Sequence, residues 1–366
     1  MTATESTGAP TGIAVVGGGS LARSICYSLA VATDPPPGAV TVLARSDQNA
    51  AEIACIANAR AVTSASPSRF TSGALDASDH EAVADELARL RPGVVINCAS
   101  LQSPWESTRA PTAWTELLAA GGFGIGLPLH AVLAREVARG IRDSGIPALF
   151  VNACYPDAVN PLLHAEGLPV FCGVGNSATL SASLHAAVRP RAGERLRVLA
   201  HHAHLHAPAH PSDEARIWLG DRPVAGVGEL LAGHRACSRE ELNAVTGHTA
   251  AVLAARLAAG AEVHASLPGP LGLPGGYPVR IHDGRITLDL PDGLTTEDAV
   301  AWQMRMAEHD GVVVTPTGDV HFGEQAGRLL SARLADTPQI YGAQDMEPLA
   351  QQLLCLRDKL RAEPAA

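Results

Sequence analysis

The sequence predicts an α/β fold, in which a doubly wound parallel sheet at the N-terminus precedes an α+β second domain. Two observations carry this prediction. Short apolar runs alternate with segments of helical spacing up to residue 175, which is the pattern of a parallel sheet buried on both faces. Beyond residue 175 the alternation gives way to longer helical segments and short hairpin-like strands. The 366 residues suffice for two domains, so we expect a flexible tail at 1–11, a first domain at 12–175 and a second domain at 176–366.

Each predicted strand of the first domain is a run rich in Val, Ile, Leu and Ala, bounded by glycine, proline or polar residues. These runs lie at 12–17, 39–44, within 61–75, and at 94–97, 148–152 and 170–172. Helical spacing of apolar residues predicts the intervening helices at 21–32, 48–59, 78–90 and 129–144, the third of which follows capping residues at 76–79.

In the second domain the same criteria predict helices at 179–188, 238–259 and 295–309, and a strand at 196–200. Asp283 and Gly284 predict a hairpin turn between two short strands, and residues 311–322 predict a second hairpin. Two further helices are expected to close the chain.

Composition excludes several classes of function. The 27 basic and 37 acidic residues give a net charge of −10, which argues against a general nucleic-acid binder. The sequence has no apolar run of about 18 residues and no secretory signal at its start, so we expect a cytoplasmic protein without a membrane span. The seven scattered cysteines lack a CxxC pair, which favours reduced thiols over disulfides or structural zinc. The single lysine, Lys359, lies close to the C-terminus, which argues against Schiff-base chemistry, and the sequence lacks the Gly-Lys-Ser/Thr of a Walker A loop.

Residues 16–22 match the pattern G-x-G-x-x-G/A through Gly17, Gly19 and Ala22. In such a turn the first glycine makes a tight bend, the second lets a pyrophosphate approach the backbone, and the small third residue lets the helix pack on the strand. Ser20 and Leu21 open the helix, whose N-terminus favours an anion. Because this turn follows a buried strand, the sequence predicts a dinucleotide site of Rossmann type.

The second strand ends at Arg45 and Ser46, where an NAD site would place an acid against the ribose hydroxyls. A guanidinium and a hydroxyl suit a ribose 2′-phosphate instead. We therefore expect NADP as the cofactor, while Asp47, one residue further, leaves NAD open.

Three stretches resemble the lactate/malate dehydrogenase family. Residues 94–109 are similar to its fourth strand and mobile loop, and residues 148–163 to the strand that ends in Ser/Thr-Asn-Pro. Residues 197–204 are similar to the strand that ends in the family's histidine. The order and spacing of these stretches agree with that family over about 200 residues.

The resemblance implies a role for each matching residue. Arg109 would polarise the substrate carbonyl, Asn152 would orient substrate and nicotinamide, Ala99 would border the cofactor, and His202 would donate the proton. A histidine that titrates near neutrality suits proton delivery to the oxygen or nitrogen of a C=O or C=N group that receives hydride. We thus expect an NAD(P)H-dependent reductase of a ketone or imine in a small metabolite, and by analogy a homo-oligomer.

The chain departs from the family after the sixth strand. There the family carries Leu-Asp-x-x-Arg, whose aspartate orients the histidine and whose arginine clamps a carboxylate, whereas this chain has Thr179 and Ala182. A plain 2-hydroxy acid is therefore not expected, and a specialised substrate, as in secondary metabolism, is. Asn176 or Thr179 would orient His202, and Arg216 is one candidate to replace the clamp.

Five histidines, His201, His202, His204, His206 and His210, lie within ten residues. On an extended strand the second, third and fourth of these would share one face and could hold zinc. A proton donor without metal is the favoured interpretation, and a polar surface is the third.

Two other functions stay open. Residues 76–79 and 92–99 are similar to the third-helix and fourth-strand region of saccharopine and opine dehydrogenases, which would imply reduction or oxidation of a C–N bond. The second alternative is a dinucleotide-binding protein without catalytic activity, and the missing Asp and Arg of the family motif favour it.

Overall fold

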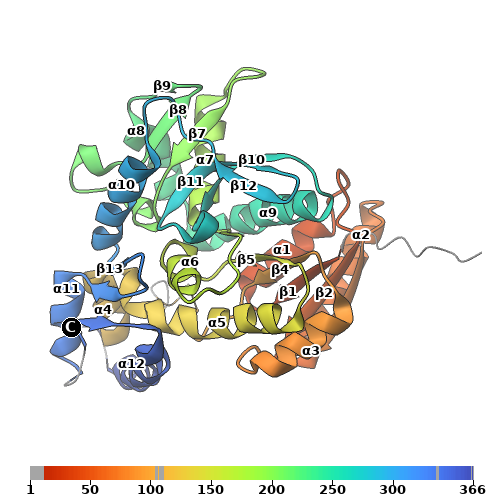
Figure 1. The fold of residues 1–366 in the computed structure, drawn as a ribbon, viewed down its shortest axis with the longest axis horizontal. Coiled ribbons are helices and arrows are strands. Elements are labelled where there is room, and N and C mark those ends of the chain that lie inside the picture. The colour runs from red at the N-terminus through yellow and green to blue at the C-terminus, as the bar shows by residue number, and fades with distance from the viewer. Residues whose placement is uncertain (1–11, 104–105, 107–110, 335–337, 364, 366) are drawn as a thin grey trace, which may run out of the picture.

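The computed structural model describes residues 12–103, 106, 111–334, 338–363 and 365, so the predicted tail at 1–11 lies outside the described residues. Its centre is a six-stranded sheet with the order β3-β2-β1-β4-β5-β6, in which every pair is parallel (Figure 1). This is the strand order of the doubly wound dinucleotide-binding fold and confirms the predicted fold class. The strands are β1 (Ile13–Val16), β2 (Ala39–Ala44), β3 (Arg69–Ala74), β4 (Val94–Asn97), β5 (Leu149–Asn152) and β6 (Cys172–Gly173).

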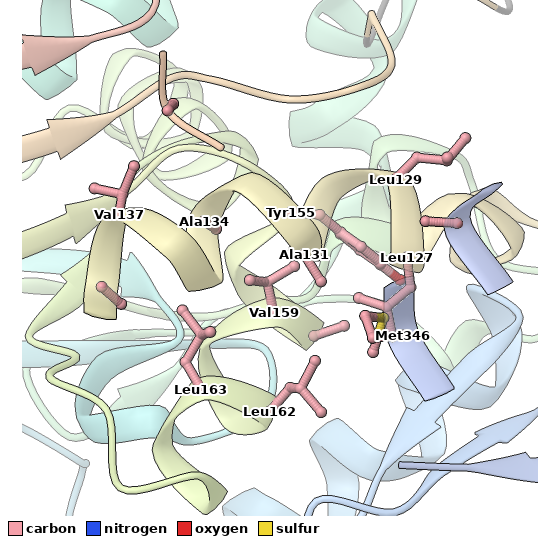
Figure 2. Close-up of a cluster of buried hydrophobic side chains, with 14 of the residues drawn as sticks. Leu127, Leu129, Ala131, Ala134, Val137, Tyr155, Val159, Leu162, Leu163 and Met346 are labelled. Carbon is pink, nitrogen blue, oxygen red and sulfur yellow. The ribbon is translucent and has the colours of Figure 1, made fainter. Parts of the chain in front are cut away.

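Alternate residues of β1 enter two separate apolar cores, one on each face of the sheet. The core that contains Ile13 and Val15 is closed by α1 (Ser20–Leu29), α2 (Asp47–Thr63) and α9 (Arg239–Ala258). The core that contains Ala14 and Val16 is closed by α3 (His80–Leu90) and α5 (Leu127–Ser144). Figure 2 shows this second core, where α5 meets side chains of α6 (Pro156–Ala165) and Met346.

Three antiparallel sheets of three strands each follow the parallel sheet. The first contains β7 (Leu196–Leu199), β8 (Arg216–Leu219) and β9 (Arg222–Pro223), and the second β10 (Val263–Pro268), β11 (Gly276–His282) and β12 (Arg285–Leu288). The third contains β13 (Val312–Val314), β14 (Val320–Phe322) and β15 (Ile340–Tyr341). The helices of this half, apart from α9, are α7 (Asn176–Val188), α8 (Val227–Ala236), α10 (Thr296–His309), α11 (Glu324–Ser331) and α12 (Met346–Arg361).

The last segment of the chain returns to the first domain. Helices α11 and α12 pack against α4 (Ala113–Gly121), and α12 also packs against α5 (Figure 1). Apolar residues of β13, β14, α11, β15 and α12 therefore share one core with α3 and α5. Both main cores draw on both halves of the sequence, and the boundary at residue 175 stays a prediction.

Several elements were not predicted. Helices α4, α6 and α8 and strands β8, β9, β10 and β15 form in segments for which the sequence predicted no helix or strand. Helix α6 begins with Pro156, which suits the first helical position, but it also contains Pro161, which normally breaks a helix. Nearly the whole helix is buried, against α5, β6, β13 and the 3₁₀ turn Pro270–Gly272, and this burial outweighs that penalty.

In the described part of the chain, no single helix has the length and apolar character needed to cross a membrane. The pair Ala113–Gly121 and Phe123–Ser144 passes that test together, but it is bent by 117°.

Candidate active site

The glycine turn lies between the end of β1 and α1, as the sequence predicted. Gly17 has a φ of +123°, and a Cβ there would lie 2.8 Å from the carbonyl carbon of Cys98, so a side chain would collide with the chain leaving β4. A Cβ on Gly19 would meet nothing within 4 Å, and Gly19 and Ser20 are exposed. Ala22 is fully buried under the helix. The N-terminus of α1 thus faces open space, as a pyrophosphate requires.

Asn49, in the first turn of α2, supports this turn and was not predicted. Its Nδ2 donates to the carbonyl oxygen of Gly18 at 3.0 Å, and its Oδ1 accepts a hydrogen bond from Arg23. Arg23 also pairs with Glu52 at 2.9 Å. The signal available in the sequence was an asparagine in the first turn of the helix after the second strand, which neighbours the strand that leads into the glycine turn.

Arg45 and Ser46 follow β2 and are both exposed. The Ser46 hydroxyl caps α2 by accepting the Asn49 N–H at 3.3 Å. Hydrogen bonds from Ser78 lower the pKa of Asp76, and the charge of Arg45 adds a smaller contribution, which places the guanidinium near the end of β3.

Asn152 ends β5 inside a buried network of amides. Its Oδ1 accepts from Nδ2 of Asn97 at 3.1 Å, and its own Nδ2 donates to Oδ1 of Asn160 at 2.9 Å and to the carbonyl of Cys154 at 3.1 Å. Both amide protons therefore bind protein groups, and the side chain has no exposed surface. This network joins the carboxyl ends of β4 and β5.

Two further predicted cofactor contacts are Ala99 and Leu21. Ala99 is half-buried beside the glycine turn. Its N–H donates to Oδ1 of Asn97 at 3.1 Å, and its carbonyl accepts from Sγ of Cys154 at 3.2 Å. Leu21 is half-buried at the start of α1. Arg109 lies outside the described residues.

His202 and Asp310 contact each other in the second part of the site. Nδ1 of His202 lies 3.0 Å from both carboxylate oxygens of Asp310, which caps the end of α10. The hydroxyl of Tyr155 donates to Oδ2 of the same carboxylate at 2.7 Å. The main-chain N–H of His202 donates to Oδ1 of Asp157 at 3.0 Å. These contacts place His202 at the N-terminus of α6, beyond the carboxyl end of β5.

A glycine-rich segment brings Asp310 to this position. Gly122 has a φ of +91°, and a Cβ there would lie 2.5 Å from the carbonyl oxygen of Asp310. The same oxygen accepts the N–H of Gly124 at 2.8 Å. Between these glycines, the ring of Phe123 lies over His202 with centroids 4.4 Å apart.

Burial and the attraction between the two groups have opposite effects on the pKa values of His202 and Asp310. Burial disfavours ionisation of Asp310, but the attraction of His202 and hydrogen bonds from His202 and Tyr155 outweigh it and lower the Asp310 pKa to about 2. Burial likewise disfavours the imidazolium, yet Asp310 outweighs it and raises the pKa of His202. Asp157 has no such cation bonded to its side chain, and burial raises its pKa to about 6. Asp310 and His202 therefore each favour the charged form of the other against the effect of burial.

The other central histidines have structural roles. His204 accepts the His201 N–H on Nδ1 at 2.8 Å, donates from Nε2 to the Asp213 carbonyl at 2.8 Å, and stacks on Trp302. Burial lowers the pKa of His201 to about 3, so this fully buried ring is neutral.

The extended strand on which His202, His204 and His206 would have shared one face for a metal ion does not form. Strand β7 ends at Leu199, and His202–Leu205 form a 3₁₀ turn, η3, so that alternate histidines do not share a strand face. Within the described ranges, no group of three or more His, Cys, Asp or Glu side chains is placed to hold a metal ion.

The predicted orienting residue Thr179 is also wrong. Its hydroxyl donates to the Gly175 carbonyl and lies 2.8 Å from the hydroxyl of Thr246, so it bonds within α7 and to α9. Arg216, considered as a clamp, lies over the ring of Trp302 at 5.1 Å. The carboxylate that contacts His202 is instead that of Asp310.

No family model matches the sequence, and no curated protein matches it either. Solved structures do match. A lactate dehydrogenase from a Medee basin deep-sea metagenome library is 13% identical, with 83% of this chain and 99% of that chain covered and a TM-score of 0.48. The malate dehydrogenase of Cryptosporidium parvum is 16% identical, with coverages of 94% and 99% and a TM-score of 0.47.

A third match, the lactate dehydrogenase of Eimeria maxima solved with NADH and oxamate, is 15% identical, with 82% of this chain and 92% of that chain covered and a TM-score of 0.49. At such identities and scores these matches carry no functional argument, and the fold is assigned from the strand order of the chain itself. These three solved structures are lactate and malate dehydrogenases, the family that the sequence resembles.

Proposed function

We propose that the protein is an NAD(P)H-dependent oxidoreductase that reduces a C=O or C=N group of a small metabolite by direct hydride transfer. The observation that carries the proposal is the His202–Asp310 pair. It stands at the carboxyl edge of the parallel sheet, the edge that also carries the glycine turn. Ligands of open α/β sheets bind in the crevice at this edge.

A nicotinamide dinucleotide bound at this edge would supply the hydride. The protein must then deliver a proton to the oxygen or nitrogen that gains charge. The ionised Asp310 holds the proton of Nδ1 in place, which leaves Nε2 of His202 to donate. Because Asp310 raises the pKa of His202 above its usual value, the ring holds its proton to a higher pH than a free imidazole would and can donate it to the substrate.

Tyr155 acts on this pair as a positioning residue. Its hydroxyl bonds one oxygen of Asp310 and thereby fixes the rotation of the carboxylate against the imidazole. Phe123 covers one face of the imidazole, and the ring of Tyr155 meets it edge-on with centroids 5.4 Å apart. A ring held in this way loses little rotational freedom when it reacts.

The cofactor contacts proposed are Gly17, Gly19, Ser20, Leu21, Ala22 and Ala99, together with Arg45 and Ser46 for a ribose 2′-phosphate. The open space over Gly19 and the exposure of Arg45 support them. NADP is the proposed cofactor, and the substrate is a specialised one. The resemblance implied that Asn152 would orient substrate and nicotinamide, but both of its amide protons bind protein groups. We propose instead that Asn152 holds the ends of β4 and β5 in register beneath this site.

A direct test follows NADPH and NADH oxidation against a panel of ketones, and of ketones with amines, using wild-type protein and His202→Gln. We expect turnover of at least one substrate class, a loss of turnover in the variant and unchanged coenzyme affinity. A C–N bonded product would select the opine-type reaction. Equal turnover by His202→Gln, or no affinity for either coenzyme, would overturn the proposal.

A further inference from the structure

A cavity of about 720 Å³ lies between the end of α10, the hairpin β13-β14 and the start of α11. These elements are the blue segments at the left of the molecule in Figure 1. The lining of the cavity includes the charged residues Glu308, Glu324 and Arg328 and the apolar residues Val313 and Phe322. A volume in this range is typical of pockets that bind small molecules.

The hairpin β13-β14 separates this cavity from His202. Tyr155, whose ring meets the imidazole edge-on, belongs to the core on one face of the hairpin. The two neighbours of Val313 on β13 point into that core. Val313 itself points to the opposite face and lines the cavity together with His321, its partner on β14. A molecule in the cavity is therefore on the other side of the hairpin from the proposed proton donor.

Opposite charges line the cavity without neutralising one another. Glu308 comes from the last turn of α10, and Glu324 and Arg328 come from α11. All three residues are exposed, and none of their side chains has a hydrogen bond or an ion pair within the part of the chain that the structure describes. His309, which also lines the cavity, already has a partner, since its Nε2 lies 3.5 Å from the carboxylate of Asp213.

The two carboxylates mark a negative end of the cavity. The carboxyl end of α10 carries a partial negative charge that adds to the charge of Glu308. A Cβ on Gly323, the N-cap of α11, would lie 3.3 Å from the carbonyl oxygen of Glu308, so the two helix ends are adjacent. Glu324, in the first turn of α11, compensates the positive end of that helix. Arg328, one turn further along α11, provides the positive charge of the cavity.

These charges select the kind of molecule that fits. An anion without a positive group would face Glu308 and Glu324, and a cation without a negative group would face Arg328. A metal ion is not supported, because in the described ranges no three His, Cys, Asp or Glu side chains are placed to hold one. A molecule with both an ammonium group and a carboxylate satisfies both ends, and a guanidinium binds a carboxylate through paired N–H donors. Val313 and Phe322 offer contacts to its apolar atoms.

We propose that this cavity binds an α-amino acid, with its ammonium group at Glu308 and Glu324 and its carboxylate at Arg328. The protein then has a second small-molecule site besides the proposed coenzyme site. Because the hairpin lies between the cavity and His202, the bound amino acid is not a substrate of the proposed reduction.

The first experiment tests the class of ligand and needs no turnover. L-Leucine, L-phenylalanine and L-glutamine are titrated by calorimetry into the full chain without coenzyme. Each is compared with the acid that lacks its amino group and with the amine that lacks its carboxylate. We expect at least one amino acid to bind about tenfold or more tightly than either of its analogues, since each analogue loses one charge pair. No binding by the three amino acids at millimolar concentration, or equal binding by the analogues, overturns the proposal.

The second experiment locates the bound amino acid. Arg328→Gln, and the double variant Glu308→Gln with Glu324→Gln, should each weaken its binding about tenfold or more. Arg305→Gln replaces an exposed arginine of α10 outside the cavity and should leave binding unchanged. Arg328→Gln should also remove the advantage of the amino acid over the amine. Since the replaced side chains are exposed, urea midpoints equal to that of wild type are expected. Wild-type binding by both cavity variants overturns the proposal.

His202→Gln separates this cavity from the active site. Amino-acid binding should be the same in this variant as in wild type, and the same with and without NADPH. Loss of binding in His202→Gln would place the amino acid in the active site and overturn the proposal. Binding that depends on Arg328, in a protein without affinity for either nicotinamide coenzyme, would overturn the proposed function and support the amino-acid site.

Discussion

Nδ1 of His202 lies 3.0 Å from the carboxylate of Asp310, although 108 residues separate the two in the sequence. The aspartate lies at the end of α10, and its main-chain carbonyl accepts a hydrogen bond from the N–H of Gly124. The acid that orients the histidine therefore reaches the site from the second half of the chain. The family that the sequence resembles carries an acid at the position of Thr179 on α7, where this chain has none.

Replacing Asp310 tests this pairing. Asp310→Asn keeps the shape of the side chain but removes the charge that holds the proton on Nδ1. We expect kcat/KM to fall on the order of 10²- to 10⁴-fold, with coenzyme affinity unchanged in a fluorescence titration. Asp319→Asn, on an exposed hairpin, is the control. A loss smaller than about threefold would show that Asp310 does not orient the proton donor.

The pH dependence of reduction follows from the sign of the His202 shift. Its pKa is raised above 6.5, so the ring is protonated below that pKa and loses its proton as pH rises through it. The rate constant kcat/KM for reduction should therefore be constant at low pH and fall above a midpoint higher than 6.5. Asp310→Asn should move this midpoint to lower pH, because the raising charge is gone.

Asp157 titrates close to this range, with a pKa of about 6. The pH profile of Asp157→Asn separates the two groups. If the fall above neutrality disappears in Asp157→Asn but persists in His202→Gln, the proton donor is misassigned.

The glycine turn offers a matched pair of substitutions. Gly17→Ala places a Cβ 2.8 Å from the Cys98 carbonyl carbon at a φ of +123°, and we expect a loss of unfolding free energy of about 2 kcal/mol or more. Gly19→Ala meets open space at an allowed φ of −78°. It should leave the urea midpoint unchanged and weaken coenzyme binding, since a methyl group would occupy the path of the pyrophosphate. Unchanged coenzyme affinity in Gly19→Ala would remove the phosphate site from this turn.

Arg45 tests the choice of coenzyme. Arg45→Asp should reverse the preference from NADPH towards NADH, because an acid repels a 2′-phosphate and accepts bonds from a free ribose diol. Fluorescence titration with both coenzymes measures the ratio of affinities, with Arg222→Gln, a 78% exposed arginine, as control. An unchanged ratio would contradict the NADP assignment.

By itself the sequence determined the features whose causes are local. Buried parallel strands are short apolar runs, so β1, β2, β4 and β5 were predicted within about two residues. The glycine turn depends on backbone angles and a missing Cβ at Gly17, which the residue types themselves specify. The resemblance to lactate and malate dehydrogenases named His202, which follows β7, as the candidate proton donor, and that role stays a prediction.

Only the tertiary structure decided which groups surround that histidine. Nothing near Asp310 in the sequence distinguishes it from an ordinary polar helix end, and its partners arrive from the glycine-rich 121–126 segment and from α6. Helix α6 itself depends on packing against α5, since its prolines argue for a loop. The two groups shift each other's pKa because packing brings them together in a buried place. The partner of His202 therefore comes from a distant segment of the chain, and the spacing of residues in the sequence does not reveal it.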